Sequence, residues 1–246
     1  MNAFLKHLWV QFKMDIREQG TLMNYYLVPL VFYLVMGAVV SSINPLAKQT
    51  LAATMVIFSV TMGAVLGIPA PIVKMRESGV LRAYHVCGIP GWAVLLIQSV
   101  SAFLHLLVVS IIIFITAPLF FGASYPQSFP AYFLTLFILL FASIALGLFI
   151  GVAARSQSIA TMLSQAVFLP TVMLSGIMFP TSMLPGPLSV VGRLLPATYI
   201  MQCFSGFAFR LPTDIDTTSA LLITAGIGVV AAGLTIVRFK TIGKSL

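Results

Sequence analysis

The chain has 246 residues, of which 13 are basic and 5 acidic, so charged side chains make up only 7% of it. Hydrophobic residues make up 60%, and the mean hydropathy is +1.09. A soluble domain carries about 25% charged residues, and a disordered chain lacks the apolar surface that this one must bury, so both classes are excluded and an integral membrane protein remains.

The first 20 residues predict an amphipathic helix. Lys6, Lys13 and Arg17 lie away from a set of apolar residues that recur at helical spacing: Phe4, Leu5, Leu8, Trp9, Phe12 and Ile16. A basic helix with a tryptophan suits the cytoplasmic interface of a membrane, with Trp9, Lys13 and Arg17 as its contact residues. Two interpretations stay open, a simple surface anchor and a lever that touches a cytoplasmic partner.

Six transmembrane helices are predicted from the gaps between charged residues. The uncharged runs are 19–47, 49–73, 83–154, 156–192 and 217–237. One span needs about 20 apolar residues, so the longest run holds two spans, divided where Gly122, Pro126 and Pro130 cluster. The predicted spans are 24–42, 51–72, 92–119, 131–153, 158–178 and 218–237. Because transmembrane strands would show short alternating segments instead, the predicted fold is all-α.

The basic residues predict the orientation. With the N-terminus in the cytoplasm, ten of the 13 basic residues face the cytoplasm: Lys6, Lys13, Arg17, Lys74, Arg76, Arg82, Arg155, Arg238, Lys240 and Lys244. Cytoplasmic loops are enriched in Lys and Arg, so we expect both termini inside. This topology accounts for the net charge of +8, and no nucleic-acid partner is expected, because no basic patch with interleaved aromatics occurs.

The loop between the second and third spans, residues 74–87, carries the densest charge cluster in the chain, and a Gly-Ile-Pro-Gly stretch from Gly88 ends it. A short helix along the membrane surface fits this pattern. The alternative is an ordinary basic cytoplasmic loop.

The region between the fifth and sixth spans is too broken by proline to cross the membrane and too apolar for an open loop. We therefore expect residues 179–212 to dip back into the outer leaflet as short helices, which is tolerated where the backbone is buried in protein or lines a cavity. The segment is either a structural cap or part of an exit path. Asp216 or Thr217 is expected to cap the sixth span. The candidate residues are Gly176, Pro180, Pro185, Pro196 and Tyr199.

Few polar residues fall inside the predicted spans. For His105, with Gln98 two turns earlier, a helix–helix hydrogen bond is favoured over a proton relay, because no Asp or Glu lies within any predicted span. The pairs Gly63–Gly67 and Gly147–Gly151 predict close helix packing, within one chain rather than between two. No catalytic constellation and no metal-ligand spacing occurs, so an enzyme is not expected.

Three motifs in order resemble the permease subunit of type-2 ABC transporters, the ABC-2 membrane family, over the whole chain. They are Arg76-Glu77-Ser78-Gly79-Val80-Leu81, then Leu174-Ser175-Gly176-Ile177-Met178-Phe179-Pro180 with Leu184-Pro185, then Leu195-Pro196-Ala197-Thr198-Tyr199. The chain departs from the family pattern at Val80, where Thr is usual, at Arg82, where an acid is common, and at Leu195, where Asn is usual.

The resemblance implies a translocating subunit of an ATP-driven exporter in the cytoplasmic membrane of a prokaryote. Two permease chains, identical or not, would form the pore, with two separate ATPase subunits beneath them that bind ATP and Mg²⁺; no cofactor is expected in this chain. The 74–87 loop would couple to the ATPase, with Gly79 allowing close backbone approach. The implied coupling residues are Arg76, Glu77, Gly79, Leu81, Arg82 and Tyr84.

The ATPase is expected on another chain, because no Gly-x-x-x-x-Gly-Lys-Ser/Thr motif occurs; Gly243-Lys244-Ser245 matches only its end, and Arg238 stands where the first Gly belongs. The expected cargo is an amphipathic drug, peptide or lipid. Two alternatives stay open: a membrane scaffold or assembly subunit without transport, and an ion-coupled secondary transporter, which the missing intramembrane acids disfavour.

Overall fold

The computed structural model describes residues 3–43, 47–86, 88–178 and 185–243. Within these ranges all regular structure is helical, which confirms the predicted all-α fold. The α-helices are α1 (Ala3–Arg17), α2 (Gln19–Leu22), α3 (Val28–Ile43), α4 (Leu51–Met62), α5 (Pro69–Glu77), α6 (Val80–Val86), α7 (Gly91–Phe121), α8 (Phe129–Ala153), α9 (Gln157–Leu174), α10 (Gly186–Gly192), α11 (Pro196–Cys203) and α12 (Thr217–Gly243). The π-helical turns η1 (Met23–Leu27) and η3 (Gly63–Gly67) join neighbouring α-helices, η5 (Phe204–Ala208) is a π-helical turn that continues α11, and η2 (Ala47–Gln49) is a 3₁₀ turn.

Six helical stretches are long and apolar enough to cross a membrane, as predicted. They are Gln19–Ser42, Leu51–Glu77, Gly91–Phe121, Phe129–Ala153, Gln157–Leu174 and Thr217–Phe239. The second runs five residues beyond the predicted end at residue 72, because the charged residues that end the apolar run do not end the helix. The fifth stops four residues before the predicted end at residue 178.

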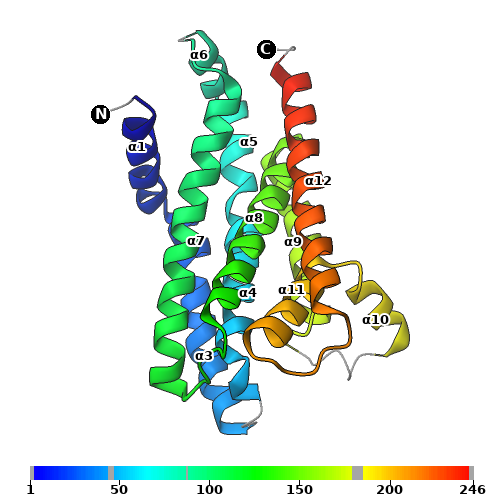
Figure 1. The fold of residues 1–246 in the computed structure, drawn as a ribbon. Helices are drawn as coiled ribbons and strands as arrows, with labels where there is room; N and C mark the ends of the chain where they lie inside the picture. Colours follow the sequence, from blue (N-terminus) through cyan, green and yellow to red (C-terminus); the bar gives the residue numbers. More distant parts are fainter. Residues whose placement is uncertain (1–2, 44–46, 87, 179–184, 244–246) are drawn as a thin grey trace.

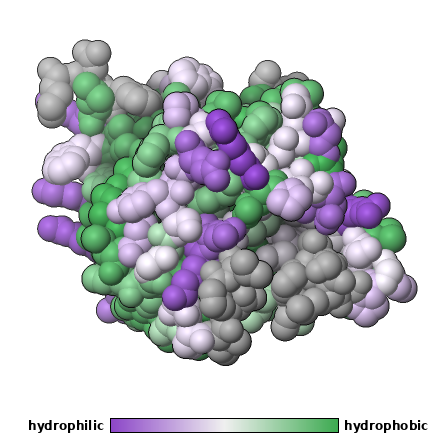
Figure 2. All heavy atoms as spheres, turned by 60° about the horizontal axis from the view of Figure 1, so that its bottom comes forward, coloured by the Kyte–Doolittle hydropathy of each residue, from purple (hydrophilic) through white to green (hydrophobic). Residues whose placement is uncertain are grey.

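The long helices form one elongated bundle (Figure 1). The N-terminal helix α1, the tip at α6 and the C-terminal end of α12 lie at one end, and α10 and α11 lie toward the other. Figure 2 looks toward that second end and shows hydrophilic side chains over it, with hydrophobic side chains along the flank. An apolar flank between two more polar ends is the surface that a bilayer requires.

The second span is the centre of the bundle. Every residue of α4 is buried, and 94% of the most apolar window of this span lies inside the molecule, whereas the corresponding share is 22% for the first span and 28% for the fifth and sixth. The second span is surrounded by other apolar spans and not by water, so it needs no polar face and can be hydrophobic on all sides.

The glycine pairs bring helices into contact within the chain, as predicted. A Cβ at Gly147 of α8 would clash with the carbonyl oxygen of Ala64 in η3, and one at Gly151 would lie 3.0 Å from Cα of Pro69. On the other side of the second span, a Cβ at Gly67 would lie 2.8 Å from the Tyr25 ring. The small residues therefore seat α8 and the first span directly against the second.

The predicted outer segment contains two short helices, each with a proline at or next to its first residue. Pro185 immediately precedes α10, and Pro196 is the first residue of α11, where a missing N–H costs nothing. Gly176 has φ +84°, which turns the chain sharply after α9. The Tyr199 hydroxyl donates to the carbonyl of Arg193 at 2.6 Å and so fixes the turn between α10 and α11. Pro180 lies outside the described residues.

Candidate functional site

Within the described residues 74–86, the predicted charged segment is a helix end followed by a short helix. Residues 74–77 complete α5 and therefore extend the second span, and α6 follows after a two-residue turn. Gly79 makes that turn with φ +74°, and a Cβ there would meet nothing within 4 Å. The positive φ explains the glycine within this chain, and the close approach of an ATPase backbone that the resemblance implies stays a prediction.

Two of the predicted coupling residues bind within the chain. The Arg76 guanidinium donates to the carbonyl oxygens of Val152, at 3.4 Å, and Ala154. These carbonyls belong to the end of α8, where a helix leaves acceptors without partners and carries partial negative charge. Glu77 accepts a hydrogen bond from the Gln157 side chain in the first turn of α9 at 3.1 Å. Arg76 and Glu77 therefore hold the end of the second span to the turn between the fourth and fifth.

The rest of the segment divides into an anchored and an exposed side. Leu81 is buried, while the Arg82 side chain is exposed and makes no hydrogen bond or ion pair with the described residues. Tyr84 shares a 3.2 Å hydrogen bond with Nε2 of His7 in α1, and their rings lie 5.4 Å apart. The first turns of α6 thus present Arg82 outward, and its far end is tied to the N-terminal helix.

A second tie joins the N-terminal helix to the charged segment. Lys74 donates to Glu18, which follows α1, at 2.8 Å. Both side chains are substantially exposed, so this ion pair positions the two helices more than it stabilises them. Helix α1 is therefore linked to the charged segment at both of its ends.

The residues that the sequence singled out in α1 lie on its outer side. Trp9 is 57% exposed and stacks on Phe12 at 6.2 Å, and the Lys13 ammonium lies 5.6 Å from the centre of the Trp9 ring. Arg17 is exposed in the last turn. An exposed tryptophan beside basic side chains agrees with the predicted interfacial position.

The inner side of α1 carries a carboxylate that sequence reasoning missed. Asp15 is 3% exposed, and it accepts hydrogen bonds from the Ser101 hydroxyl of α7 at 2.5 Å and from Gln11 at 2.8 Å. Its Oδ2 atom lies 3.8 Å from Nε2 of His105. Burial raises the pKa of the Asp15 carboxyl group, against the smaller lowering effect of the Ser101 and Gln11 hydrogen bonds.

His105 is the centre of this cluster. Its Nδ1 shares a 2.7 Å hydrogen bond with the Tyr26 hydroxyl, and its ring stacks on Phe12 with centroids 4.1 Å apart. The predicted helix–helix hydrogen bond is therefore present, but the expectation that His105 has no acid nearby is wrong, because Asp15 comes from the interfacial helix and not from a span. A single acid within an apolar helical stripe, four positions after Gln11, was the signal available in the sequence.

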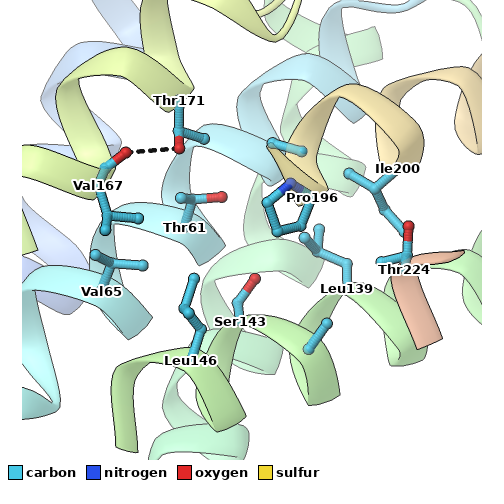
Figure 3. A pocket seen from close by; sticks show the side chains of 12 residues that line it. Thr61, Val65, Leu139, Ser143, Leu146, Val167, Thr171, Pro196, Ile200 and Thr224 are labelled. Carbon is cyan, nitrogen blue, oxygen red and sulfur yellow. Dashed lines mark hydrogen bonds between the residues drawn. The ribbon is translucent and has the colours of Figure 1, made fainter. Parts of the chain in front are cut away.

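The middle of the bundle contains a small cavity with hydroxyl groups around it (Figure 3). Thr61 of α4 and Ser143 of α8 point toward it, whereas Thr171 of α9 is hydrogen-bonded to the carbonyl of Val167 at 2.7 Å. Its volume is about 20 Å³, which is enough for one water molecule and too small for an organic substrate.

Comparison with known proteins agrees with this architecture. The family model for the ABC-2 type transporter matches residues 3–209. Two curated relatives, each named inner membrane transport permease YhhJ, from Escherichia coli strain K12 and from Shigella flexneri, are 27% identical to the chain over 192 residues. The match covers 76% of this chain and 51% of each relative, so the chain spans about half the length of the curated relatives it matches. The chain has six apolar helices, and the family match runs from α1 to residue 209, just past η5. The chain is therefore a multi-pass membrane protein that belongs to the ABC-2 type transporter family.

Proposed function

We propose that this chain is the translocating subunit of an ATP-driven exporter in the inner membrane of a bacterium, coupled through α6 to a separate ATPase that binds ATP and Mg²⁺. The observation that carries the proposal is the packing of residues 74–86. Lys74, Arg76 and Glu77 are each bonded to a different neighbouring helix or turn, while Arg82 is left exposed at the tip. Such a segment receives force at an exposed surface and passes it to several helices at once.

Each tie connects α6 or the end of α5 to a different part of the bundle. Arg76 and Glu77 lead to the fourth and fifth spans, and Tyr84 leads to α1 through His7. From α1 the contact continues through Asp15 to the third span. A push on α6 would therefore move α1 together with these spans, which favours the lever over the simple anchor for the N-terminal helix.

A second permease chain completes the proposed assembly. The fifth span exposes Gln165 and Thr161 together with the apolar side chains of Met162 and Met173, and Gln165 makes no hydrogen bond with the described residues. An amide facing lipid is costly, because hydrocarbon offers it no partner. We therefore assign the α9 face to the second chain and to the passage between the two chains.

The cargo that suits this passage is amphipathic, a drug, a peptide or a lipid. Methionine and leucine side chains of the exposed α9 face adapt to varied apolar shapes, and the Gln165 amide offers a polar contact. Outward movement is proposed from the family resemblance. The scaffold and ion-coupled alternatives predict no cargo movement driven by ATP.

A charge reversal at the tip of α6 tests the coupling. The chain would be tagged and purified in mild detergent from its own membranes, and the preparation assayed for co-purifying ATPase. In Arg82→Glu we expect the co-purifying ATPase activity to fall at least about tenfold, which is equivalent to a loss of about 1.4 kcal/mol of binding free energy. Arg193→Glu is the matched control, because this arginine is also exposed but lies beside α10 at the other end of the bundle.

The outcomes separate the hypotheses. Loss of the ATPase with Arg82→Glu and its retention with Arg193→Glu would support coupling through α6. ATPase retained by both variants would refute the role of α6, and a wild-type preparation that never carries an ATPase would move the function to the scaffold or ion-coupled alternatives.

A further inference from the structure

The carboxyl group of Asp15 lies between α1 and α7, with no cation within hydrogen-bonding distance among the described residues. We propose that Asp15 is a protonation-controlled latch, in which the neutral acid holds the interfacial helix α1 against the third span and ionisation of the acid loosens it. This inference rests on the packing of one chain and stands independently of the proposed transport function.

The groups that face the latch come from three elements. Ser101 and His105 belong to α7, Gln11 belongs to α1 itself, and Glu18 follows α1. Tyr25 and Tyr26 of η1 stand behind the histidine, with ring centroids 5.5 and 5.6 Å from its own. The negative charge of Glu18 opposes ionisation of Asp15, and the Lys74 ammonium is engaged by Glu18 at 2.8 Å.

The hydrogen bonds suit a neutral acid at this position. A carboxylic acid can donate to the Ser101 oxygen across the 2.5 Å contact while its other oxygen still accepts from Gln11 at 2.8 Å. Nε2 of His105 stays 3.8 Å from Oδ2, which exceeds hydrogen-bond length, and this nitrogen makes no hydrogen bond with the described residues. The ionised carboxylate would therefore be buried with two neutral donors and no close cation, which is unfavourable.

The direction of the pH dependence follows from this burial. Desolvation raises the pKa of Asp15 when α1 is docked, so the docked state binds the proton more tightly than an undocked, solvated helix does. Docking is then strongest when Asp15 is protonated, and it weakens as the pH rises through the raised pKa. One proton changes the docking equilibrium by at most about tenfold for each pH unit.

Hydrogen–deuterium exchange of the full chain in lipid nanodiscs tests the latch. The protection of the α1 amides, corrected for the intrinsic exchange rate, would be followed from about pH 4.5 to about pH 8.5, a range that starts above the ordinary pKa of Asp. In the wild type we expect this protection to fall with pH, by up to about tenfold per unit. Asp15→Asn, which keeps the shape of the neutral acid, should hold α1 protected at every pH. A flat wild-type profile, or the same slope in Asp15→Asn, would overturn the proposal.

Two further variants make the test independent of how well Asp15→Asn folds. Ser101→Ala removes the hydroxyl group of the 2.5 Å contact but leaves the Asp15 carboxyl group buried against α7, so the fall of α1 protection with pH should persist in this variant, and a flat profile would contradict the latch. Glu18→Gln is the matched control, because it removes a carboxylate three residues away that is paired with Lys74. In Glu18→Gln the protection of α1 should fall with pH as steeply as in the wild type. A flat profile in this variant would show that the pH dependence comes from the Glu18–Lys74 pair and not from Asp15.

Discussion

Replacing Gly147 by alanine tests the packing of the second span against the fourth. The added Cβ would overlap the Ala64 carbonyl oxygen and lie 3.0 Å from the Ala64 carbonyl carbon and 3.3 Å from Cβ of Ile68. Overfilling a packed interior costs about 1–3 kcal/mol, and we expect about 3 kcal/mol here because the atoms in conflict are backbone atoms that no rotamer change can move. Alanine regains about 1 kcal/mol of helix propensity, so the net loss is about 2 kcal/mol.

Thermal unfolding in detergent measures this loss. For a chain of this size, about 1 kcal/mol corresponds to a shift of about 2–4 °C in Tm, so Gly147→Ala should unfold about 4–8 °C below the wild type. Gly226→Ala is the matched control, because this glycine is also inside a span and a Cβ there meets nothing within 4 Å. It should be neutral or slightly stabilising. Equal Tm values for the two variants would refute the close seam between α8 and the second span.

Three further predictions concern single side chains. Arg76→Gln should destabilise the chain by about 1.5–3 kcal/mol, because it removes charge-assisted hydrogen bonds to the end of α8. Arg82→Gln should change the stability by less than about 0.5 kcal/mol. Thermal unfolding of both variants checks this contrast, and similar losses of stability would contradict it. Tyr26→Phe should cost about 1 kcal/mol, since it removes the hydrogen bond to His105 and keeps the ring, and an unchanged Tm would show that this bond contributes nothing. The hydrogen bonds that Asp216 accepts from the backbone and side chain of Ser219 lower the pKa of Asp216. The contribution of Asp216 to stability is therefore present above its pKa in the unfolded chain, and it is lost as the pH falls through its pKa in the folded chain. Asp216→Asn should flatten the acid limb of a plot of Tm against pH, and an unchanged limb would refute this assignment.

The amino-acid sequence predicts the spans well because charge is so sparse. A run of apolar residues between two charges must lie in the membrane and must be helical there, so all six spans are at the predicted places. The predicted cap at Asp216 and the in-chain seam at Gly147 and Gly151 are also confirmed. Each of these follows from a local pattern, a cap or a pair of small residues on one helix face.

What could not be predicted depends on contacts between distant segments. Asp15 reads as one more charge on an interfacial helix, and only the packing of α1 on α7 places it beside Ser101, 86 residues away. Arg76 matches a family motif, so the sequence assigns it to an ATPase contact, yet its partners are carbonyls at the end of α8, which no side-chain pattern reveals. Backbone acceptors and tertiary burial leave little trace in the order of residues.

Photo-cross-linking from α6 in intact cells tests the central claim most directly. A photoreactive residue at the exposed position of Ala83 should capture a soluble protein that carries the Gly-x-x-x-x-Gly-Lys-Ser/Thr nucleotide-binding motif. The same residue at Val190 of α10, which is 61% exposed at the other end of the bundle, should not. Mass spectrometry of the cross-linked products identifies the captured protein. We expect the ATPase to be captured from position 83 alone. Capture of no nucleotide-binding protein there, or of the same ATPase from position 190, would contradict coupling through α6.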